Sequence, residues 1–289
     1  MQNRIEYILF ILLSFLFKLI GLTNARKFAK LMGAFFYYII PIRKKTVYEN
    51  LKIAFPNFDE KKINQVALGS YISFSVALVE ILYMPWMTRR ELENAVLFLN
   101  RDLILEKHKE NKGVILLSAH FGNWEYIAAS GGCQLNVPFS VIVKSQRNTL
   151  VDNWINKMRT RWTNKVIFLG VSIRYIYKEM LDKNIVAMVA DQRGPREGIR
   201  VNFFGRPTAI YQGPAMLALK TGAPILYGIA VRQTDAIYKV EMVEIDRSNL
   251  PDDDSEKVIE ISQRHMAHLE KLIREHPEQW LWHHKIWKY

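Results

Sequence analysis

Short apolar runs alternate with helical patterns between residues 114 and 243, and this alternation constrains the fold more than any other feature. The run at 114–117 has no polar position at all, as expected of a strand buried on both faces of a sheet. Strands are predicted at 114–117, 139–143, 166–168, 185–190, 225–231 and 237–243, with an edge strand at 201–204. Helices are predicted between them at 124–129, 149–162, 173–181 and 211–221. The pattern indicates an α/β fold, a mostly parallel sheet covered by helices on both faces.

Helical patterns also flank this region. Residues 59–83 form one long pattern that ends before Pro85, and Thr88 with Glu91 has the form of a capping box that opens another helix. A third helix is expected at 102–112, ended by Gly113, and a long amphipathic helix at 255–275.

The N-terminal region is apolar but interrupted. Residues 7–17 are apolar except for Ser14, and a second apolar stretch covers 31–42. Each is shorter than the roughly 20 residues of a comfortable membrane span. A signal peptide, a buried core helix and a retained membrane anchor are the three interpretations. Six basic residues follow and favour the anchor, lying against anionic headgroups on the cytoplasmic side. They are Arg26, Lys27, Lys30, Arg43, Lys44 and Lys45. We therefore divide the chain into anchor helices at 1–45 and a catalytic domain at 46–289.

The net charge of +12 limits the partners of the protein. Nucleic acid, an anionic membrane surface and an acidic carrier protein all match a basic protein. The Lys and Arg residues form no dense run of the kind found in nucleic-acid-binding tails, which disfavours nucleic acid. The one cysteine, Cys133, excludes an internal disulfide and is expected to be a buried structural residue.

A histidine directly after the predicted strand 114–117 is the main candidate for chemistry. His120 is followed by Asn123, a residue that caps helices, and by Glu125 in the first turn of the next helix. A turn of this kind can fold the carboxylate back onto the imidazole, which gives a general base for an alcohol nucleophile. His265 and Glu270 have the same spacing but fall within one helix, where they point about 140° apart and form no such pair.

Other polar residues follow neighbouring strands. Asp191 and Gln192 come after strand 185–190 and open a loop rich in arginine, which includes Arg193, Arg196, Arg200 and Arg206. Lys144, Arg147 and Asn148 follow strand 139–143. These groups suit phosphate or carboxylate recognition, or they are simply solvated loops. One His and one Glu are too few ligands for zinc, and no nucleotide-binding glycine pattern is present, so neither a metal nor a cofactor is expected.

Several blocks in a fixed order resemble the bacterial lipid A biosynthesis acyltransferases, the late lauroyl and myristoyl enzymes of the wider His-x4-Asp/Glu glycerolipid acyltransferase superfamily. The resemblance covers nearly the whole chain, including the apolar N-terminal segment. The blocks are Ser-Ala-His-Phe-Gly-Asn-Trp-Glu at 118–125, Arg147-Asn148, Ala-Asp-Gln at 190–192, Phe-Phe-Gly at 203–205, Gly213-Pro214, Thr-Gly-Ala-Pro at 221–224 and Pro-Glu-Gln-Trp-Leu-Trp at 277–282. Lys144 departs from the family pattern, which has a less charged residue there.

The resemblance implies transfer of an acyl chain from acyl carrier protein, or from acyl-CoA, to a hydroxyl of a lipid A precursor or related glycolipid. The site would face the cytoplasm at the inner membrane. His120 and Glu125 match the catalytic pair of the family, and Arg147, Asp191 and Gln192 match positions near the site. Asn123, Lys144, Asn148, Arg193 and Arg196 complete the expected substrate-binding set. Three alternatives remain: an acyltransferase that acts on a different glycolipid or phospholipid acceptor, a lipid-surface binding protein without catalysis, and a nucleic-acid-binding protein, whose affinity would fall steeply with salt.

Overall fold

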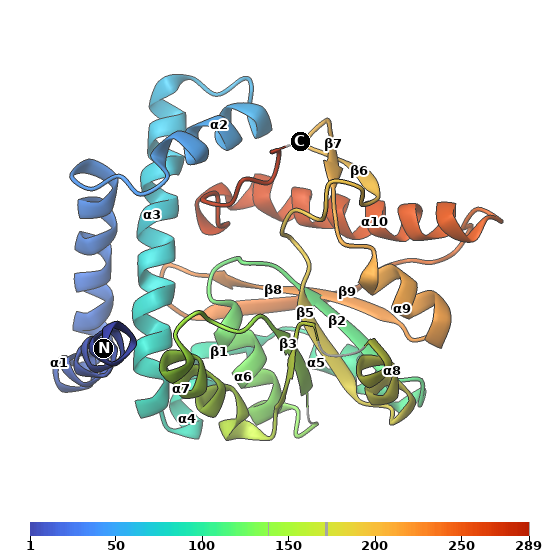
Figure 1. Cartoon of the computed structure of the whole chain (residues 1–289), viewed down its shortest axis with the longest axis horizontal. Coiled ribbons are helices and arrows are strands. Elements are labelled where there is room, and N and C mark those ends of the chain that lie inside the picture. The colour runs from blue at the N-terminus through green and yellow to red at the C-terminus, as the bar shows by residue number, and fades with distance from the viewer. Residues whose placement is uncertain (138, 171–172, 289) are drawn as a thin grey trace.

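A mostly parallel β-sheet forms the centre of the protein. The computed structural model describes residues 1–137, 139–170 and 173–288 (Figure 1). Within these residues seven strands form one sheet in the order β1-β9-β8-β2-β5-β3-β4. The strands are β1 (Val96–Phe98), β2 (Val114–Ser118), β3 (Phe139–Val143), β4 (Lys165–Phe168), β5 (Ile185–Val189), β8 (Ile225–Arg232) and β9 (Tyr238–Glu244). Only β8 and β9 pair antiparallel among them, so the predicted fold class is confirmed.

Helices cover both faces of this sheet. The helices of the described residues are α1 (Gln2–Tyr38), α2 (Lys44–Ala54), α3 (Glu60–Tyr83), α4 (Arg89–Ala95), α5 (Arg101–Lys109), α6 (Trp124–Gln134), α7 (Thr149–Arg159), α8 (Ile173–Leu181), α9 (Gly213–Thr221) and α10 (Asp254–Glu275), of which α1 and α2 pack on α3. Alternate residues of β2 point to opposite faces: Ile115 and Leu117 pack with α8, α9 and α10, whereas Val114 and Leu116 pack with α4 to α7. The apolar run therefore has no polar position because both of its faces are buried.

Most predicted elements are confirmed with ends shifted by a few residues, and three further elements were not predicted. Strand β1 has only three residues and follows α4 directly, so it leaves little periodic signal. The expected edge strand at 201–204 is instead β6 (Arg200–Phe203), which forms a separate hairpin with β7 (Arg206–Ala209). Phe204 and Gly205 both have positive φ at its turn. Helix α2 is the third unpredicted element.

The two apolar N-terminal stretches belong to one helical element, α1, which changes direction at Gly21. This glycine has φ 77° and ψ 156°, which breaks the helix into a first segment at 2–20 and a second at 22–38. The second segment lies beside α3 (Figure 1). Ala25, Ala29 and Gly33 form the contact surface, and a Cβ atom at Gly33 would lie 2.6 Å from the Cα of Ile72. Small side chains therefore allow the two helices to approach closely.

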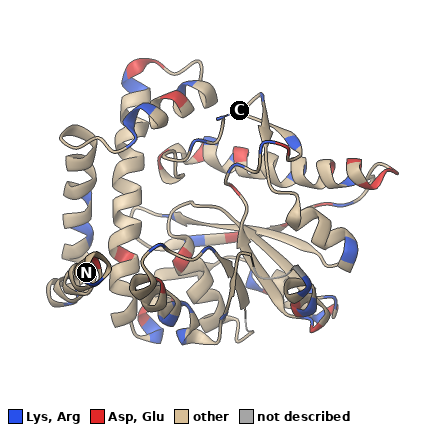
Figure 2. Ribbon diagram, in the orientation of Figure 1, with Lys and Arg blue, Asp and Glu red and all other residues tan. Residues whose placement is uncertain are grey.

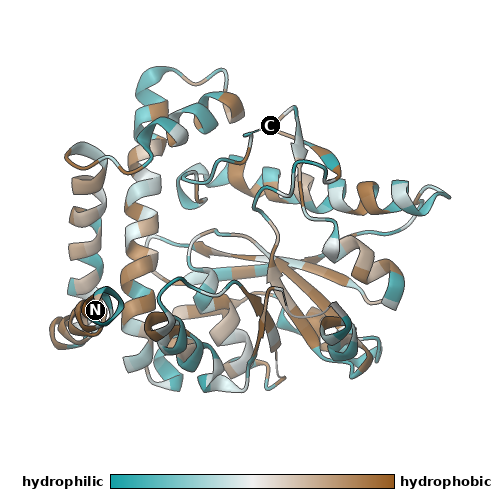
Figure 3. Ribbon diagram, in the orientation of Figure 1, coloured by the Kyte–Doolittle hydropathy of each residue, from teal (hydrophilic) through white to brown (hydrophobic). Residues whose placement is uncertain are grey.

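The first segment of α1 exposes large apolar side chains to the outside of the protein. They are Ile5, Ile8, Leu9, Leu12, Leu13, Leu16 and Leu19. The brown colour of this part of the ribbon in Figure 3 marks its hydrophobic residues. Both α1 and α3 have the length and hydropathy of a membrane span, but only 11% of the α1 window is buried within the protein, against 61% for α3. Charged residues are sparse on both helices (Figure 2). Helix α1 is thus the apolar segment available for membrane attachment.

Candidate active site

The parallel register of β2 and β5 brings His120 and Asp191 together. Ser118 at the end of β2 pairs with Val189 at the end of β5, and each candidate residue lies two positions beyond its strand. Both side chains therefore lie at the carboxyl edge of the sheet. Ligands bind at this edge in open α/β folds. The position of Asp191 next to the histidine follows directly from this register.

Asp191 binds His120 through both of its carboxylate oxygens. Its Oδ1 lies 2.8 Å from Nδ1 of the imidazole, and its Oδ2 accepts a 2.8 Å hydrogen bond from the backbone N–H of His120. The indole N–H of Trp280 donates a third hydrogen bond to Oδ2, at 2.9 Å. Because Asp191 is almost fully buried, these donors replace the water that the carboxylate loses. The carboxylate and the imidazole are therefore held in one relative orientation.

The two groups influence each other's ionisation. Burial lowers the pKa of His120, but the charge and hydrogen bond of Asp191, with a further contribution from the charge of Glu125, bring it above its ordinary value. Burial raises the pKa of Asp191, but His120 and Trp280 bring it below its ordinary value. An ionised Asp191 favours a proton on Nδ1 of His120, where the carboxylate accepts the hydrogen bond. In a neutral imidazole, this tautomer places the basic lone pair on Nε2.

The loop that carries His120 is fixed by the C-terminal segment and by β8. The carbonyl of His120 accepts a hydrogen bond from Leu281 N–H, and Gly122 N–H donates to the carbonyl of Gln279. Gly122 has φ 53°, and a Cβ atom there would lie 1.9 Å from the carbonyl oxygen of Ala230. Only glycine fits at this position. The C-terminal residues Trp280 and Trp282 are buried in the core, and this segment also supports the site.

The expected contact between Glu125 and the imidazole is wrong. The Glu125 carboxylate forms two hydrogen bonds with the guanidinium of Arg159 at the end of α7, at 2.5 and 2.9 Å. Both side chains are nearly buried, with 8% and 11% exposed. Glu125 does lie in the first turn of α6, but its carboxylate turns toward α7 because a buried cation is available there. Asp191 therefore occupies the place that the spacing of the motif suggested for Glu125.

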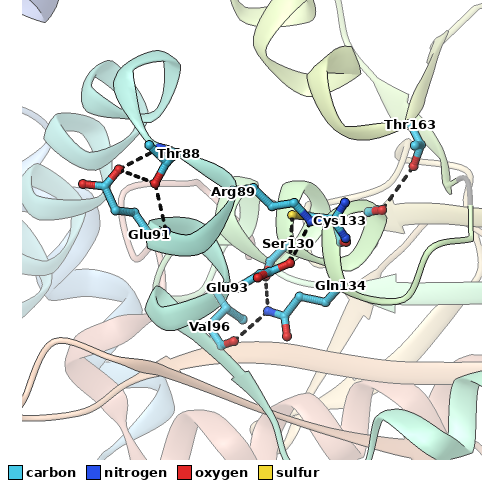
Figure 4. A network of polar contacts seen from close by, with 10 residues as sticks. Thr88, Arg89, Glu91, Glu93, Val96, Ser130, Cys133, Gln134 and Thr163 are labelled. Atoms are coloured by element: carbon cyan, nitrogen blue, oxygen red, sulfur yellow. Dashed lines mark hydrogen bonds and ion pairs between the residues drawn. The ribbon is translucent and has the colours of Figure 1, made fainter.

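Helix α6 begins at the predicted cap. The Asn123 side chain accepts a hydrogen bond from Tyr126 N–H, which confirms its capping position, and it is fully buried. The far end of α6 is bound to α4 (Figure 4). Arg89 donates to the carbonyl of Cys133, and Gln134 donates to the carbonyl of Val96. Cys133 is buried, as expected. The helix that follows His120 is thus fixed at both ends.

The residues after β3 lie at the same edge of the sheet but bind the N-terminus of the chain. Asn148 caps α7 and donates through Nδ2 to Asn3 O and to Glu6 Oε2, each at 2.9 Å. Arg147 is 82% exposed and forms an ion pair with Glu6 at 3.3 Å. Lys144 is exposed. Asn148 is therefore a structural residue in this state, whereas Lys144 and Arg147 remain accessible from outside.

The arginine-rich loop after Asp191 runs beside the C-terminal segment. Gln192 and Arg196 are exposed. The backbone N–H of Arg193 donates to Nε2 of His284 at 3.1 Å, and its guanidinium donates to the carbonyl of Lys285. Arg193 thus holds the loop in place, and Gln192 and Arg196 remain available at the surface next to Asp191.

A small pocket beside His120 has mixed walls, with Ser70 and Gln279 among its polar residues. Phe74 from α3, Trp124 from α6 and Leu281 from the C-terminal segment line it together with the imidazole. The ring centroid of Trp124 lies 4.9 Å from that of His120. Sequence reasoning did not find Phe74, since nothing in the helical pattern of α3 marks it. The side chain of His120 is 16% exposed, so part of its ring remains accessible.

The other histidine–glutamate pair of equal spacing has no comparable geometry. His265 is buried within α10 without a hydrogen-bond partner for either ring nitrogen, and burial lowers its pKa to about 4. Glu270 instead accepts hydrogen bonds from Phe204 N–H and from Arg274. Among the described residues no group of three potential metal ligands comes together.

A partly exposed imidazole, oriented by a buried carboxylate at the edge of a parallel sheet, is an arrangement that can act as a general base. Residues 2–289 match the model of a protein family described as bacterial lipid A biosynthesis acyltransferase. The chain belongs to this family and is an acyltransferase. The family assignment made from the ordered sequence blocks is thereby confirmed.

Individual relatives are similar at modest identity. The lipid A biosynthesis lauroyltransferase of Escherichia coli (strain K12) is 24% identical over 249 residues, which cover 85% of this chain and 79% of the relative. The lipid A biosynthesis palmitoleoyltransferase of the same organism is 23% identical over 265 residues, 89% and 82% of the two chains. A phosphatidylinositol mannoside acyltransferase of Mycobacterium tuberculosis (strain ATCC 25618 / H37Rv) is 26% identical over 118 residues, 39% of this chain and 37% of that one.

Proposed function

We propose that this acyltransferase moves a fatty acyl chain from a thioester, carried by acyl carrier protein or CoA, to a hydroxyl of a lipid A precursor or a related glycolipid. The reaction takes place at the cytoplasmic face of the inner membrane. The observation that carries the proposal is the His120–Asp191 pair, in which Asp191 engages Nδ1 and leaves Nε2 to act as the base. The names of the relatives, which include lipid A and phosphatidylinositol mannoside enzymes, support a glycolipid acceptor.

The mechanism follows from the acidity of the acceptor. An alcohol does not ionise near neutral pH, so Nε2 of His120 takes its proton as the oxygen attacks the thioester carbonyl. Asp191 stabilises the resulting imidazolium by charge and by its hydrogen bond at Nδ1. The tetrahedral intermediate then collapses, the C–S bond breaks, and the imidazolium returns the proton to the leaving thiolate. Glu125 contributes through its charge from a greater distance.

Exposed basic and polar residues beside the pair provide contacts for anionic substrates. Lys144, Arg147, Gln192 and Arg196 surround the carboxyl edge of β3 and β5, and all four are accessible. Cationic side chains of this kind bind phosphate groups of a lipid headgroup or of the donor. They also match an acidic carrier protein or an anionic membrane surface.

Contacts along the first segment of α1 support attachment in the plane of the membrane. Glu6 binds the loop before α7, Phe10 packs edge-on against Trp154 at 4.9 Å, and Ser14 donates to the carbonyl of Leu82. The segment therefore lies along the protein over most of its length, with its apolar side outward. Such a helix enters the interface without crossing the bilayer and brings His120 close to a lipid acceptor.

Replacement of the proposed base tests the reaction. We expect His120→Ala to lower turnover at least about 1,000-fold, because no other group at the site removes the hydroxyl proton. The assay follows thiol release from an acyl-carrier thioester in the presence of extracted lipid, with mass spectrometry of the acylated product. His108→Ala, on the outer side of α5, is the matched control. Near-wild-type turnover of folded His120→Ala protein contradicts the assignment.

Removal of residues 1–24 tests the attachment. We expect the shortened protein to leave vesicles of phosphatidylethanolamine and phosphatidylglycerol in a flotation assay, since the exposed apolar side chains of the first segment of α1 are lost. Leu9→Lys with Leu16→Lys makes the same test while the contacts of Glu6 and Ser14 remain. If both proteins still float with the vesicles, another surface attaches the enzyme to the membrane.

A further inference from the structure

A buried polar network connects the membrane-attached helix α1 to the loop that carries His120. Its centre is Glu80 on α3, whose side chain has no exposed surface. Arg26 on α1 donates to Oε1 at 2.7 Å, and Oε2 accepts hydrogen bonds from Asn123 at 2.9 Å and from Tyr238 at 2.6 Å. The network therefore joins α1, α3, β9 and the start of α6 at a single carboxylate.

A fully buried carboxylate such as that of Glu80 needs a counter-ion and hydrogen-bond donors in place of water. Burying a carboxylate costs several kcal/mol unless a counter-ion and hydrogen bonds replace water. Arg26 supplies the charge, and it also donates to the carbonyl of Ala236 in the turn between β8 and β9. The small residues Ala25 and Ala29 on the adjoining part of α1 let this segment pack closely on α3, so the guanidinium reaches Glu80. Packing and charge pairing thus depend on each other.

The network acts on the site through Asn123. The two polar atoms of its amide bind different partners: Oδ1 accepts from Tyr126 N–H and caps α6, and Nδ2 donates to Glu80. Asn123 is three residues after His120, and the intervening Gly122 is fixed against Gln279. If Glu80 no longer accepts from Nδ2, the amide is free to rotate and the cap of α6 weakens. The loop then loses one of the contacts that keep the imidazole against Asp191.

We propose that Glu80, with Arg26 as its counter-ion, is a positioning residue that makes helix α1 part of the support of the active site in addition to its membrane attachment. This role rests on the proposed function of His120 as the base. The network touches no substrate, so it acts on the geometry of the pair and leaves the binding of lipid unchanged. A displacement of about 1 Å in a catalytic group is enough to lower turnover about 100-fold.

The test uses the full-length protein in nanodiscs of phosphatidylethanolamine and phosphatidylglycerol. Glu80→Leu removes the carboxylate, Glu80→Gln keeps one acceptor oxygen, and Arg26→Met removes the counter-ion. Glu60→Gln, at the exposed first turn of the same helix, is the matched control. For each protein we measure kcat, KM, flotation with vesicles, and the protonation midpoint of the His120 ring by carbon NMR, with His120→Gln to assign the signal.

We expect Glu80→Leu to lower kcat about 100-fold and Glu80→Gln about 10-fold, with KM and flotation within about twofold of the wild type. The midpoint of His120 should fall, because a looser loop weakens the hydrogen bond to Asp191. A purely structural role would reduce the folded fraction and leave the midpoint of the folded protein unchanged. If the protonation midpoint of His120 in Glu80→Leu, Glu80→Gln and Arg26→Met equals that in the Glu60→Gln control, the proposal is overturned.

One further variant and one property of the NMR measurement ensure that the experiment gives a clear result. Tyr238→Phe deletes one hydroxyl from the network, so it reports on Glu80 even if Glu80→Leu does not fold, and we expect a smaller shift in the same direction. The NMR midpoint needs no substrate. If the wild-type protein transfers no acyl group, the proposed function fails, and the midpoints still decide whether the network positions His120.

Discussion

Two buried carboxylates influence His120, and they differ in what they bind. Asp191 follows β5 and accepts hydrogen bonds from the ring, from the backbone N–H of His120 and from Trp280. Glu125 begins α6 and forms an ion pair with Arg159. The motif His-x4-Glu suggests the second carboxylate as the helper of the base, but the structure assigns the ring contact to the first. Neighbours in sequence are therefore a weaker guide to this site than neighbours in the sheet.

The difference has a simple physical origin. Strands β2 and β5 are hydrogen-bonded in register, so residues just beyond their ends are about one strand spacing apart. Glu125 is separated from His120 by a turn and a helix cap, and its side chain points toward whichever partner packs on α6. That partner is Arg159, which compensates the charge of the carboxylate. One carboxylate serves the base, and the other joins α6 to α7.

Replacement of Asp191 should give the largest effect on turnover. The amide of Asp191→Asn can donate to Nδ1 of His120 and so favour the tautomer with a proton on Nε2, which is unable to act as a base. We expect kcat to fall about 1,000- to 10,000-fold with intact folding, as when the aspartate of a catalytic triad is replaced by asparagine. Thiol-release kinetics and circular dichroism measure the two quantities. A loss below tenfold would make Glu125 the more important carboxylate after all.

Replacement of Glu125 should affect stability more than chemistry. Glu125→Leu leaves the guanidinium of Arg159 nearly buried without its counter-ion, which we expect to lower the free energy of unfolding by about 3–5 kcal/mol. The kcat of the folded protein should fall only about tenfold, because Asp191 still orients the ring. Thermal unfolding in detergent and kinetics normalised to folded protein separate the two effects.

A double-mutant cycle sharpens this distinction. Glu125→Leu combined with Arg159→Met removes both charges and should recover most of the lost stability, as replacing a whole buried ion pair with apolar residues usually does. We do not expect Arg159→Met to restore what Asp191→Asn loses, because Asp191 is not part of the Glu125–Arg159 ion pair. If the double variant is no more stable than Glu125→Leu, the ion pair does not explain why this carboxylate turns toward α7.

The parts of the fold that could be predicted from the sequence are those determined by local patterns. The run at 114–117 has no polar residue because both faces of β2 are buried, and the cap of α3 at Asp59 and the capping box of Thr88 and Glu91 depend only on residues three apart. Asn123 as the cap of α6 belongs to the same class. Each of these features is decided within a few residues, so the sequence contains the information directly.

The features that could not be predicted depend on contacts between distant segments. Arg159 is 34 residues from Glu125, and Trp280 is 89 residues from Asp191; neither distance leaves a local signal. Asp191 was placed near the site because it follows a strand, but its contact with His120 required the strand order, in which β5 lies next to β2. The position of the first segment of α1 could not be predicted either, because it depends on contacts with Leu82 and Asn148, which lie far along the chain.

The pH dependence of turnover should show the smallest difference between the carboxylates. Burial lowers the pKa of His120, but Asp191 and, to a lesser extent, Glu125 raise it, with a net increase over the ordinary value of about 6.5. The base must be neutral, so turnover is full above the raised pKa and is lost as the pH falls through it. Glu125→Gln removes only a distant charge and should move this midpoint down, whereas loss of the Asp191 hydrogen bond should move it further in the same direction. A kcat/KM profile from pH 5 to 9 measures both shifts. Equal shifts for Glu125→Gln and Asp191→Asn would mean that charge alone, without the hydrogen bond at Nδ1, sets the basicity of His120.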